Sequence, residues 1–214
     1  GIRHRAFGYE SPDGGFGDIA QFEKAGYVKS MCTTQIAESV SLPPGANRDV
    51  TVHPLSSDAH WQTVRGHHEQ NMAPNVDQKA HAVYIDGRLK EMRRLVDQGH
   101  GQWLGAWLGS KLIGSCGIFV GPDGTARYQE VTFDNTHRRQ GVCARLVAEA
   151  GRVALTKLEA HRLIISAHQG SSACRIYERV GFSIIGMSPG LCKRPPEYIG
   201  QSIFRPVKNE RSAH

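Results

Sequence analysis

The chain has 214 residues, of which 39% are hydrophobic and 21% are charged, as is typical of a globular domain with a core of useful size. Its formal net charge is +6, but the basic residues are scattered rather than blocked, which disfavours a nucleic-acid-binding surface. No run reaches the roughly 18 apolar residues that a membrane-spanning helix needs, and no apolar signal segment opens the sequence. We therefore expect neither nucleic acid nor a membrane as a partner.

The five cysteines are odd in number and widely scattered, and none forms a CxxC pair. This pattern disfavours a disulfide framework and a zinc ribbon, and it is typical of a protein kept in a reducing compartment. We expect a cytoplasmic protein without a structural metal.

The N-terminal part of the sequence stands apart from the rest. Residues 41–47 contain tandem prolines followed by Gly and Asn, which break both helix and strand and predict a linker. Before the linker, residues 5–9 and 31–36 are predicted strands. Residues 19–27 resemble residues 174–182 in the order of their aromatic, charged and glycine positions. We interpret residues 1–46 as an extension of a main domain that spans residues 47–214.

The main domain is predicted to alternate between strands and helices, as in an α/β fold with a mixed sheet. An alternating run over residues 49–53 predicts the first strand, and Ser57 or Asp58 is expected to cap the helix that follows. A second helix is predicted over residues 76–96, with an apolar face that includes Val83 and Tyr84. The later elements are strands over 102–108, 112–120 and 126–133, a helix over 142–158, a strand over 163–165, a helix over 171–180 and a strand from 182.

A basic, glycine-containing loop joins the strand that ends at Phe133 to the helix that begins near Val142. The first turn of a helix carries unpaired N–H groups and a partial positive charge, so it attracts phosphate. Gly141 allows the backbone to approach a ligand closely, and Arg138 and Arg139 supply forked donors suited to a diphosphate. Taken alone, the same residues also fit an ordinary strand-to-helix turn with solvated arginines.

Two segments together resemble a known family. Arg138-x-x-Gly141-x-Cys143 is similar to the acetyl-CoA motif of the GNAT superfamily of N-acetyltransferases, Gln/Arg-x-x-Gly-x-Gly/Ala, with Cys143 in place of the final small residue. Residues 177–182, which read Tyr-Glu-Arg-Val-Gly-Phe, resemble the second signature of the family. The two segments have the expected order and separation.

The resemblance implies a GNAT-like fold with a short N-terminal β-α-β-like extension, and transfer of an acetyl group from the cosubstrate acetyl-CoA to an amine, without a metal. With this resemblance, the likeness of residues 19–27 to residues 174–182 predicts that residues 1–46 are a degenerate half of a second GNAT unit, in which Phe22 stands where Tyr177 stands; chance similarity over nine residues is the alternative. The strand before the loop would hold the pantetheine arm, and the loop amides would hold the pyrophosphate. The implied cosubstrate-binding residues are Val131, Thr132, Phe133, Arg138, Arg139, Gln140, Gly141, Val142, Cys143 and Ala144.

Direct attack of an amine on a thioester needs a base, an oxyanion site and an acid for the leaving thiolate. Tyr177 matches the tyrosine that serves as the acid in many family members, although its helical face also suits core packing. Glu130 and His168 are the candidate bases, with a chain of waters as the alternative. The glutamate that certain relatives carry on the later strand is replaced here by Ile165.

The acceptor is not specified by any motif. We expect residues 57–96 and 187–198 to shape its pocket, and we expect a small-molecule or peptide amine; a homodimer is kept open as the assembly. The histidines His53, His60, His67 and His68 are interpreted as polar positions or as part of the acceptor wall rather than as metal ligands. The alternative functions are a non-catalytic acyl-CoA-binding module and, from the isoelectric point near 9.2, a nucleic-acid-binding protein.

Overall fold

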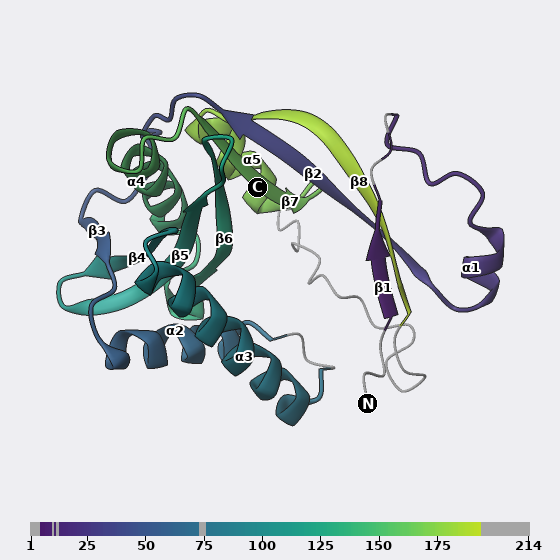
Figure 1. Cartoon of the computed structure of the whole chain (residues 1–214), viewed down its shortest axis with the longest axis horizontal. Coiled ribbons are helices and arrows are strands. Elements are labelled where there is room, and N and C mark those ends of the chain that lie inside the picture. The colour runs from purple at the N-terminus through teal and green to yellow at the C-terminus, as the bar shows by residue number, and fades with distance from the viewer. Residues whose placement is uncertain (1–4, 10, 12, 73–75, 194–214) are drawn as a thin grey trace, which may run out of the picture.

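The computed structural model describes residues 5–9, 11, 13–72 and 76–193. These residues form one mixed sheet in the order β1-β8-β2-β7-β6-β5-β4-β3 (Figure 1). Neighbouring strands are antiparallel except β6 and β7, which are parallel. The elements are β1 (Arg5–Gly8), α1 (Ala20–Lys24), β2 (Val28–Ala37), β3 (Val50–Pro54), α2 (Asp58–Gln70), α3 (Gln78–Asp97), β4 (Gly101–Leu108), β5 (Lys111–Val120), β6 (Thr125–Phe133), the 3₁₀ turn η1 (Asn135–His137), α4 (Val142–Lys157), β7 (Arg162–His168), α5 (Ser172–Val180) and β8 (Ser183–Lys193).

The predicted α/β class and the mixed sheet are confirmed, and three helices begin at polar caps. Ser57 accepts a hydrogen bond from the His60 N–H at 3.3 Å, and Ser171 accepts one from the Cys174 N–H at 3.1 Å. Asp77 caps α3 in the same way, at 2.8 Å from the Ala80 nitrogen. These side chains satisfy backbone donors that the first turn of a helix leaves unpaired.

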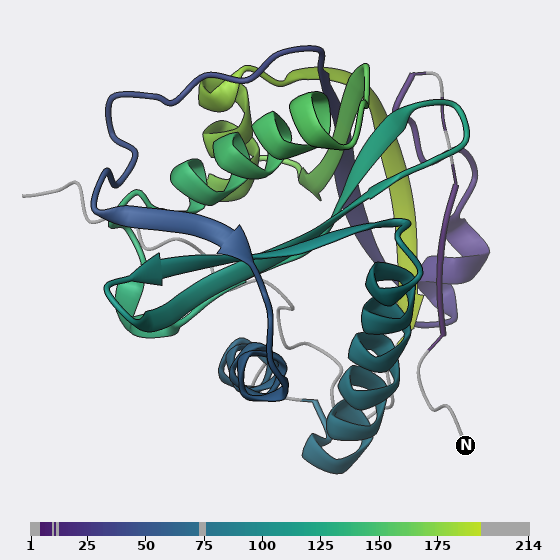
Figure 2. The same ribbon diagram turned by 60° about the vertical axis from the view of Figure 1, so that its left-hand side comes forward.

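Helices cover both faces of the central strands. Helices α2 and α3 lie on one face, and α4 and α5 lie on the other (Figure 2). The predicted apolar stripe of α4 is confirmed, since Leu146, Val147 and Ala154 are fully buried in the main core. A second apolar cluster joins α2 and α3 to Trp103 and Trp107 of β4, which share one face of that strand.

One detail of the α3 prediction was wrong. Val83 and Tyr84 are 74% and 61% exposed, and the buried residues are Ile85, Leu89 and Met92. Positions i, i+4 and i+7 share one helical face, whereas Val83 and Tyr84 lie to one side of it.

The N-terminal segment contributes two strands to the same sheet. Strand β2 lies between β7 and β8 and pairs antiparallel with both, while β1 pairs with the outer edge of β8. The segment that was predicted as a linker then runs across to the start of α4, where the Asn47 N–H donates to the Gly141 carbonyl at 3.2 Å.

This half of the sheet has an internal repeat. If β1 is exchanged with β7 and β2 with β8, the strand order β1-β8-β2-β7 becomes the same order read in reverse. A short helix connects β1 to β2, and another connects β7 to β8. In Figure 1, β2 and β8 run side by side from α5 to α1. The units β1–α1–β2 and β7–α5–β8 are therefore related by an approximate two-fold axis.

Candidate active site

A gap opens in the sheet between β6 and β7. The two strands pair only over residues 125–127 and 162–164, and beyond that point no register joins them. Residues 128–133 pair with β5 on one side only. On the edge of β6 that faces β7, the backbone N–H and C=O groups therefore have no hydrogen bonds to a neighbouring strand. An extended ligand can bind such groups. The predicted pantetheine-binding residues Val131, Thr132 and Phe133 lie on this stretch.

A β-bulge distorts β6 beside the gap. Ser115 pairs with Thr132 but Gly117 pairs with Gln129, so β6 carries an additional residue between these pairs. Glu130 lies in the bulge with a φ of 51°, a left-handed conformation that is unfavourable for a side chain larger than glycine. Such strain costs about 1–3 kcal/mol and is concentrated at functional sites. The bulge aims the Glu130 side chain toward α3, where it meets Arg88.

The loop after β6 ends in a left-handed residue at the start of α4. Gly141 is the N-cap of α4, with a φ of 74°, and no side chain caps the helix. The first-turn N–H groups of a helix have no partner within the helix, so they are available to an anion. Val142 and Ala144 have buried side chains and contribute only their backbone to the loop surface.

Gly141 is required by packing inside the protein. A Cβ at this position would overlap the Gly45 carbonyl oxygen and would lie 2.7 Å from the Asn47 nitrogen. The reason given from the sequence, close approach of a ligand, is therefore incomplete. The 41–47 segment lies against the loop and fixes its path.

The two arginines of the loop differ in their surroundings. The Arg138 guanidinium donates to the Asn71 side-chain oxygen at 2.6 Å, and the Asn71 amide donates to the Phe133 carbonyl at 2.6 Å. Asn71, the C-cap of α2, thus joins the loop to the end of β6. Arg139 is exposed and has a φ of 60°, and the exposed Gln140 side chain donates to the Thr136 carbonyl at 3.2 Å.

Tyr177 projects from α5 into the core next to the loop. It is 5% exposed, and its phenol lies among the thiols of Cys116, Cys143 and Cys174. Burial raises the pKa of Tyr177 well above its usual value, and burial also raises the pKa of the Cys143 thiol to about 12. Both groups therefore remain protonated at neutral pH. Tyr177 belongs to the same apolar core as Val142 and Ala144 in the first turn of α4, and Cys143 packs against that core.

The two candidate bases lie on different strands. Glu130, on β6, pairs with Arg88 at 3.2 Å, and Arg88 also donates to the Gln129 side chain at 3.1 Å. His168 ends β7, where its Nδ1 lies 3.4 Å from the Cys32 sulfur on β2. Burial lowers the pKa of His168, which favours the neutral imidazole.

The remaining histidines divide into two groups. His53 and His60 pack on the Trp107 ring, with centroids 4.7 and 4.6 Å away. His67 is buried, and burial lowers the pKa values of both His67 and His68. Within the described ranges, no group of three or more His, Cys, Asp or Glu side chains could hold a metal ion.

Asn71 and Arg88 were not singled out from the sequence, although both lie within residues 57–96, which were expected to shape the acceptor pocket. They belong to α2 and α3, and no motif surrounds them in the sequence. Only the packing of these helices on β6 brings them to the bulge and the loop. The C-terminal part of the expected acceptor wall, residues 194–198, lies outside the described residues.

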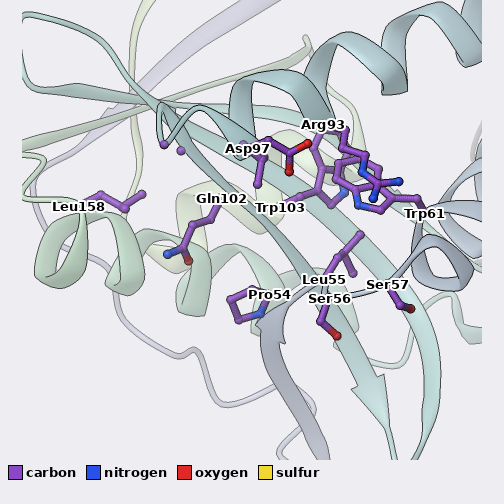
Figure 3. Close-up of a pocket in the computed structure, with 13 residues that line it drawn as sticks. Pro54, Leu55, Ser56, Ser57, Trp61, Arg93, Asp97, Gln102, Trp103 and Leu158 are labelled. Atoms are coloured by element: carbon purple, nitrogen blue, oxygen red, sulfur yellow. The ribbon is translucent and has the colours of Figure 1, made fainter.

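A cavity of about 410 Å³ lies elsewhere, between the N-terminal end of α2, the C-terminal end of α3 and the start of β4 (Figure 3). Trp61, Trp103 and Arg93 line it, together with Leu158 at the end of α4. A helix of 16 residues is about 24 Å long, so this cavity lies about that far from the loop at the start of α4. It is separate from the gap beside β6.

A family model described as the Acetyltransferase (GNAT) family matches residues 64–182, more than half of the chain. The chain belongs to the GNAT acetyltransferase family. The match includes the bulge, the loop and the Tyr177 helix, and it confirms the family predicted from the two signatures.

Solved structures show the same fold at low sequence identity. A conserved protein of unknown function from Staphylococcus epidermidis has a TM-score of 0.67 and 17% identity, over 90% of this chain and 73% of its own. A GCN5-related N-acetyltransferase from Sphaerobacter thermophilus has a TM-score of 0.64 and 15% identity, over 90% of this chain, which spans only 61% of that protein. A spermidine N-acetyltransferase from Vibrio cholerae, solved with CoA and spermine, has a TM-score of 0.50 and 15% identity, over 68% of this chain and 95% of its own.

A search of curated protein sequences gave no match. In the part of the chain that the structure describes, no helix is long and apolar enough to cross a membrane.

Proposed function

We propose that this GNAT protein transfers an acetyl group from acetyl-CoA to a primary amine by direct attack of the amine on the thioester. One arrangement carries the proposal. The uncapped start of α4 follows the unpaired edge of β6 through a short loop, and Tyr177 packs in the same core as the first turn of α4. The start of α4 is an anion site that suits the pyrophosphate. The edge of β6 is an extended-chain site that suits the pantetheine arm, and Tyr177 is a proton donor that suits the thioester sulfur.

In the proposed complex, the first-turn amides of α4 and the Arg139 side chain hold the pyrophosphate. Arg138 is already bonded to Asn71, so its main role is to fix the loop. The pantetheine arm pairs with the free edge of β6, and the gap leaves room for the acyl group between the strands.

The reaction then needs three proton transfers. The acceptor ammonium loses a proton to the Glu130 carboxylate, and the free amine attacks the thioester carbonyl carbon. As the carbon–sulfur bond breaks, the sulfur takes the electron pair and a proton from Tyr177; the nitrogen then gives its second proton to the Tyr177 phenolate, which restores the phenol and leaves the neutral amide. The products are an N-acetylated amine and CoA. His168 is the alternative base, since it also lies on a strand that borders the gap.

Binding of acetyl-CoA, measured by isothermal titration calorimetry, tests the loop. Gly141 is unsuitable for this test because its substitution would displace residues 45–47. We expect Arg139→Glu to weaken binding about 10-fold, since one ionic contact to phosphate becomes repulsive. Arg162→Glu is the control, because it makes the same charge change on an exposed residue that lies beside the start of β6, whereas the loop follows the end of β6. Equal effects of both substitutions would contradict the placement of the loop.

Release of free CoA in the presence of amines separates the enzyme from a non-catalytic acyl-CoA-binding module. The panel includes polyamines, because one structural neighbour is a spermidine N-acetyltransferase, together with amino acids, aminoglycosides and peptides. Acetyl-CoA binding without CoA release for any amine would favour the binding module. The acceptor class and a homodimer remain predictions.

We also propose that residues 1–46 are the degenerate half of a second GNAT unit. The repeat of β7–α5–β8 by β1–α1–β2 supports this interpretation. Deletion of residues 1–40 removes β2 and leaves the facing edges of β7 and β8 unpaired, so we expect an unfolded or inactive protein. A folded and fully active truncation, judged by circular dichroism and CoA release, would contradict the proposal that this segment completes the domain.

A further inference from the structure

Arg88 of α3 lies against the stretch of β6 that borders the gap. Its Nε donates to the Glu130 carboxylate at 3.2 Å, and its Nη2 donates to the Gln129 side-chain oxygen at 3.1 Å. Gln129 and Glu130 belong to the bulged part of β6, whose edge toward β7 is unpaired. The Arg88 guanidinium is therefore fixed at two points beside the proposed base.

The fixed guanidinium still has donors to offer. Within the described ranges, its Nη1 has no hydrogen-bond partner, and the Arg88 side chain is 33% exposed. An arginine presents five N–H donors in a planar fork, and only two of its three nitrogens are bonded here. The remaining donors can therefore hold a second anion while the bonded nitrogens stay on β6.

The acids that neighbour Arg88 along α3 do not neutralise it. Asp86 pairs with Arg65 at 2.6 Å, and Glu91 pairs with Arg94 at 2.7 Å. Among the described residues, Glu130 is thus the only carboxylate in an ion pair with Arg88. When the acceptor ammonium approaches Glu130, it also approaches the Arg88 cation, and the two positive charges repel each other. A negative group on the acceptor removes this repulsion.

We propose that Arg88 binds a carboxylate of the acceptor, so that the preferred acceptor is an α-amino acid or another amine with a carboxylate beside it. This inference rests on the proposed acetyl transfer and names its substrate class. The acceptor ammonium faces Glu130, and the acceptor carboxylate faces the open donors of Arg88. The two opposite charges of the acceptor thus match two opposite charges of the protein that are 3.2 Å apart. A polyamine brings only cations to the same place.

Matched acceptors isolate the contribution of the carboxylate. Alanine, phenylalanine and lysine are each compared with their α-carboxamides, which have nearly the same shape but no negative charge at this position, in the CoA-release assay. We expect the kcat/KM of the wild-type protein to be about 10-fold higher for the amino acid, because the carboxamide lacks a charge-assisted hydrogen bond to the partly exposed guanidinium. Putrescine and spermidine should be poorer acceptors still.

Arg88→Met removes the guanidinium and keeps much of the apolar stem. The preference for the amino acid over its carboxamide should then disappear, mainly through a higher KM for the amino acid. Loss of the ion pair with Glu130 affects both acceptors alike, so the ratio of the two kcat/KM values reports on the carboxylate alone. Arg88→Lys keeps the charge without the fork and should retain part of the preference. Arg94→Met is the control on the same helix, because Arg94 pairs with Glu91 and Gln98, and it should leave the ratio unchanged.

Isothermal titration of the same acceptors into the CoA-bound protein tests the site without catalysis. The proposal is overturned if the wild-type protein prefers the carboxamides or the polyamines, or if Arg88→Met keeps the preference for the amino acids. If no amine causes CoA release, the proposed function fails, while tighter binding of an amino acid than of its carboxamide, lost in Arg88→Met, still supports the carboxylate site. If no amino acid binds either, both proposals fail. If circular dichroism shows that Arg88→Met does not fold, the wild-type preference and Arg88→Lys decide the matter.

Discussion

The units β1–α1–β2 and β7–α5–β8 have the same local structure but different surroundings. In each, a helix ends at a glycine with positive φ, Gly26 at 87° and Gly181 at 122°. The next residue is aromatic, and its N–H donates to the carbonyl of an aromatic residue in the helix. This distance is 2.9 Å from Tyr27 to Phe22 and 3.1 Å from Phe182 to Tyr177. The aromatic rings are 5.5 and 6.3 Å apart.

Burial distinguishes the two units. Helix α4 packs against α5, and Tyr177 is 5% exposed, whereas its counterpart Phe22 on α1 is 39% exposed. The same short sequence pattern thus forms the same helix end with or without a covering layer. At the aromatic position within the helix, only the covered copy carries a hydroxyl, on Tyr177, and only that copy includes a strand that borders the gap in the sheet. The comparison teaches that local sequence sets the turn, while the covering helix gives one copy a site.

Truncation of the paired aromatic residues should give the largest difference between the units. We expect Phe182→Ala to lower the free energy of unfolding by about 3–5 kcal/mol, because it leaves a cavity in the main core. Tyr27→Ala removes a half-buried ring and should cost about 1 kcal/mol. Urea unfolding measures both. Equal losses would mean that the N-terminal unit is as tightly packed as the covered one.

Removal of the Tyr177 hydroxyl, which Phe22 lacks, should affect catalysis and leave the fold intact. We expect Tyr177→Phe to lower kcat about 100-fold, because the leaving thiolate loses its proton donor. The reciprocal change, Phe22→Tyr, should leave kcat within about twofold, since α1 lies outside the gap. The assay is CoA release, with the melting temperature as a check on folding. An unaffected kcat in Tyr177→Phe would reduce the residue to core packing.

The two glycines should differ in their tolerance of alanine. At Gly181 the φ of 122° is unfavourable for any side chain, and a Cβ would lie 3.2 Å from the Ser39 carbonyl oxygen. We expect Gly181→Ala to cost about 2–3 kcal/mol of unfolding free energy. Gly26→Ala should cost about 1 kcal/mol, since a Cβ there meets nothing within 4 Å and only the positive φ opposes it. The reverse order of stabilities would show that packing around Gly26 is tighter than in this structure.

The smallest effect is expected at an ion pair that only the N-terminal unit has. Lys29 and Glu23 are 3.0 Å apart, and both side chains are about half exposed. The equivalent positions in the other unit are Glu178 and Ile184, which cannot form such a pair. We expect Lys29→Met to change the unfolding free energy by less than about 0.5 kcal/mol, and by less still at high salt, because water and ions screen exposed charges. A larger loss would indicate that this pair holds α1 in place.

The sequence predicted most of the fold because its signals are local. Ser57 and Ser171 cap helices where hydroxyl side chains precede apolar periodicity, and the stripe of α4 is buried as its spacing indicates. The error at Val83 and Tyr84 also has a local origin, since an apolar residue beside a helical face was counted as part of it. For the site, the loop and Tyr177 were found from short motifs.

Contacts between distant elements were beyond the reach of these signals. The sequence by itself determined the helices and strands, the family, and the basic glycine loop that precedes α4, because each depends on neighbouring residues. Only the tertiary structure decided that β2 lies between β7 and β8, that Asn71 anchors Arg138, and that Arg88 pairs with Glu130. These contacts join residues from separate elements, and no periodicity or spacing in the chain specifies which element packs on which.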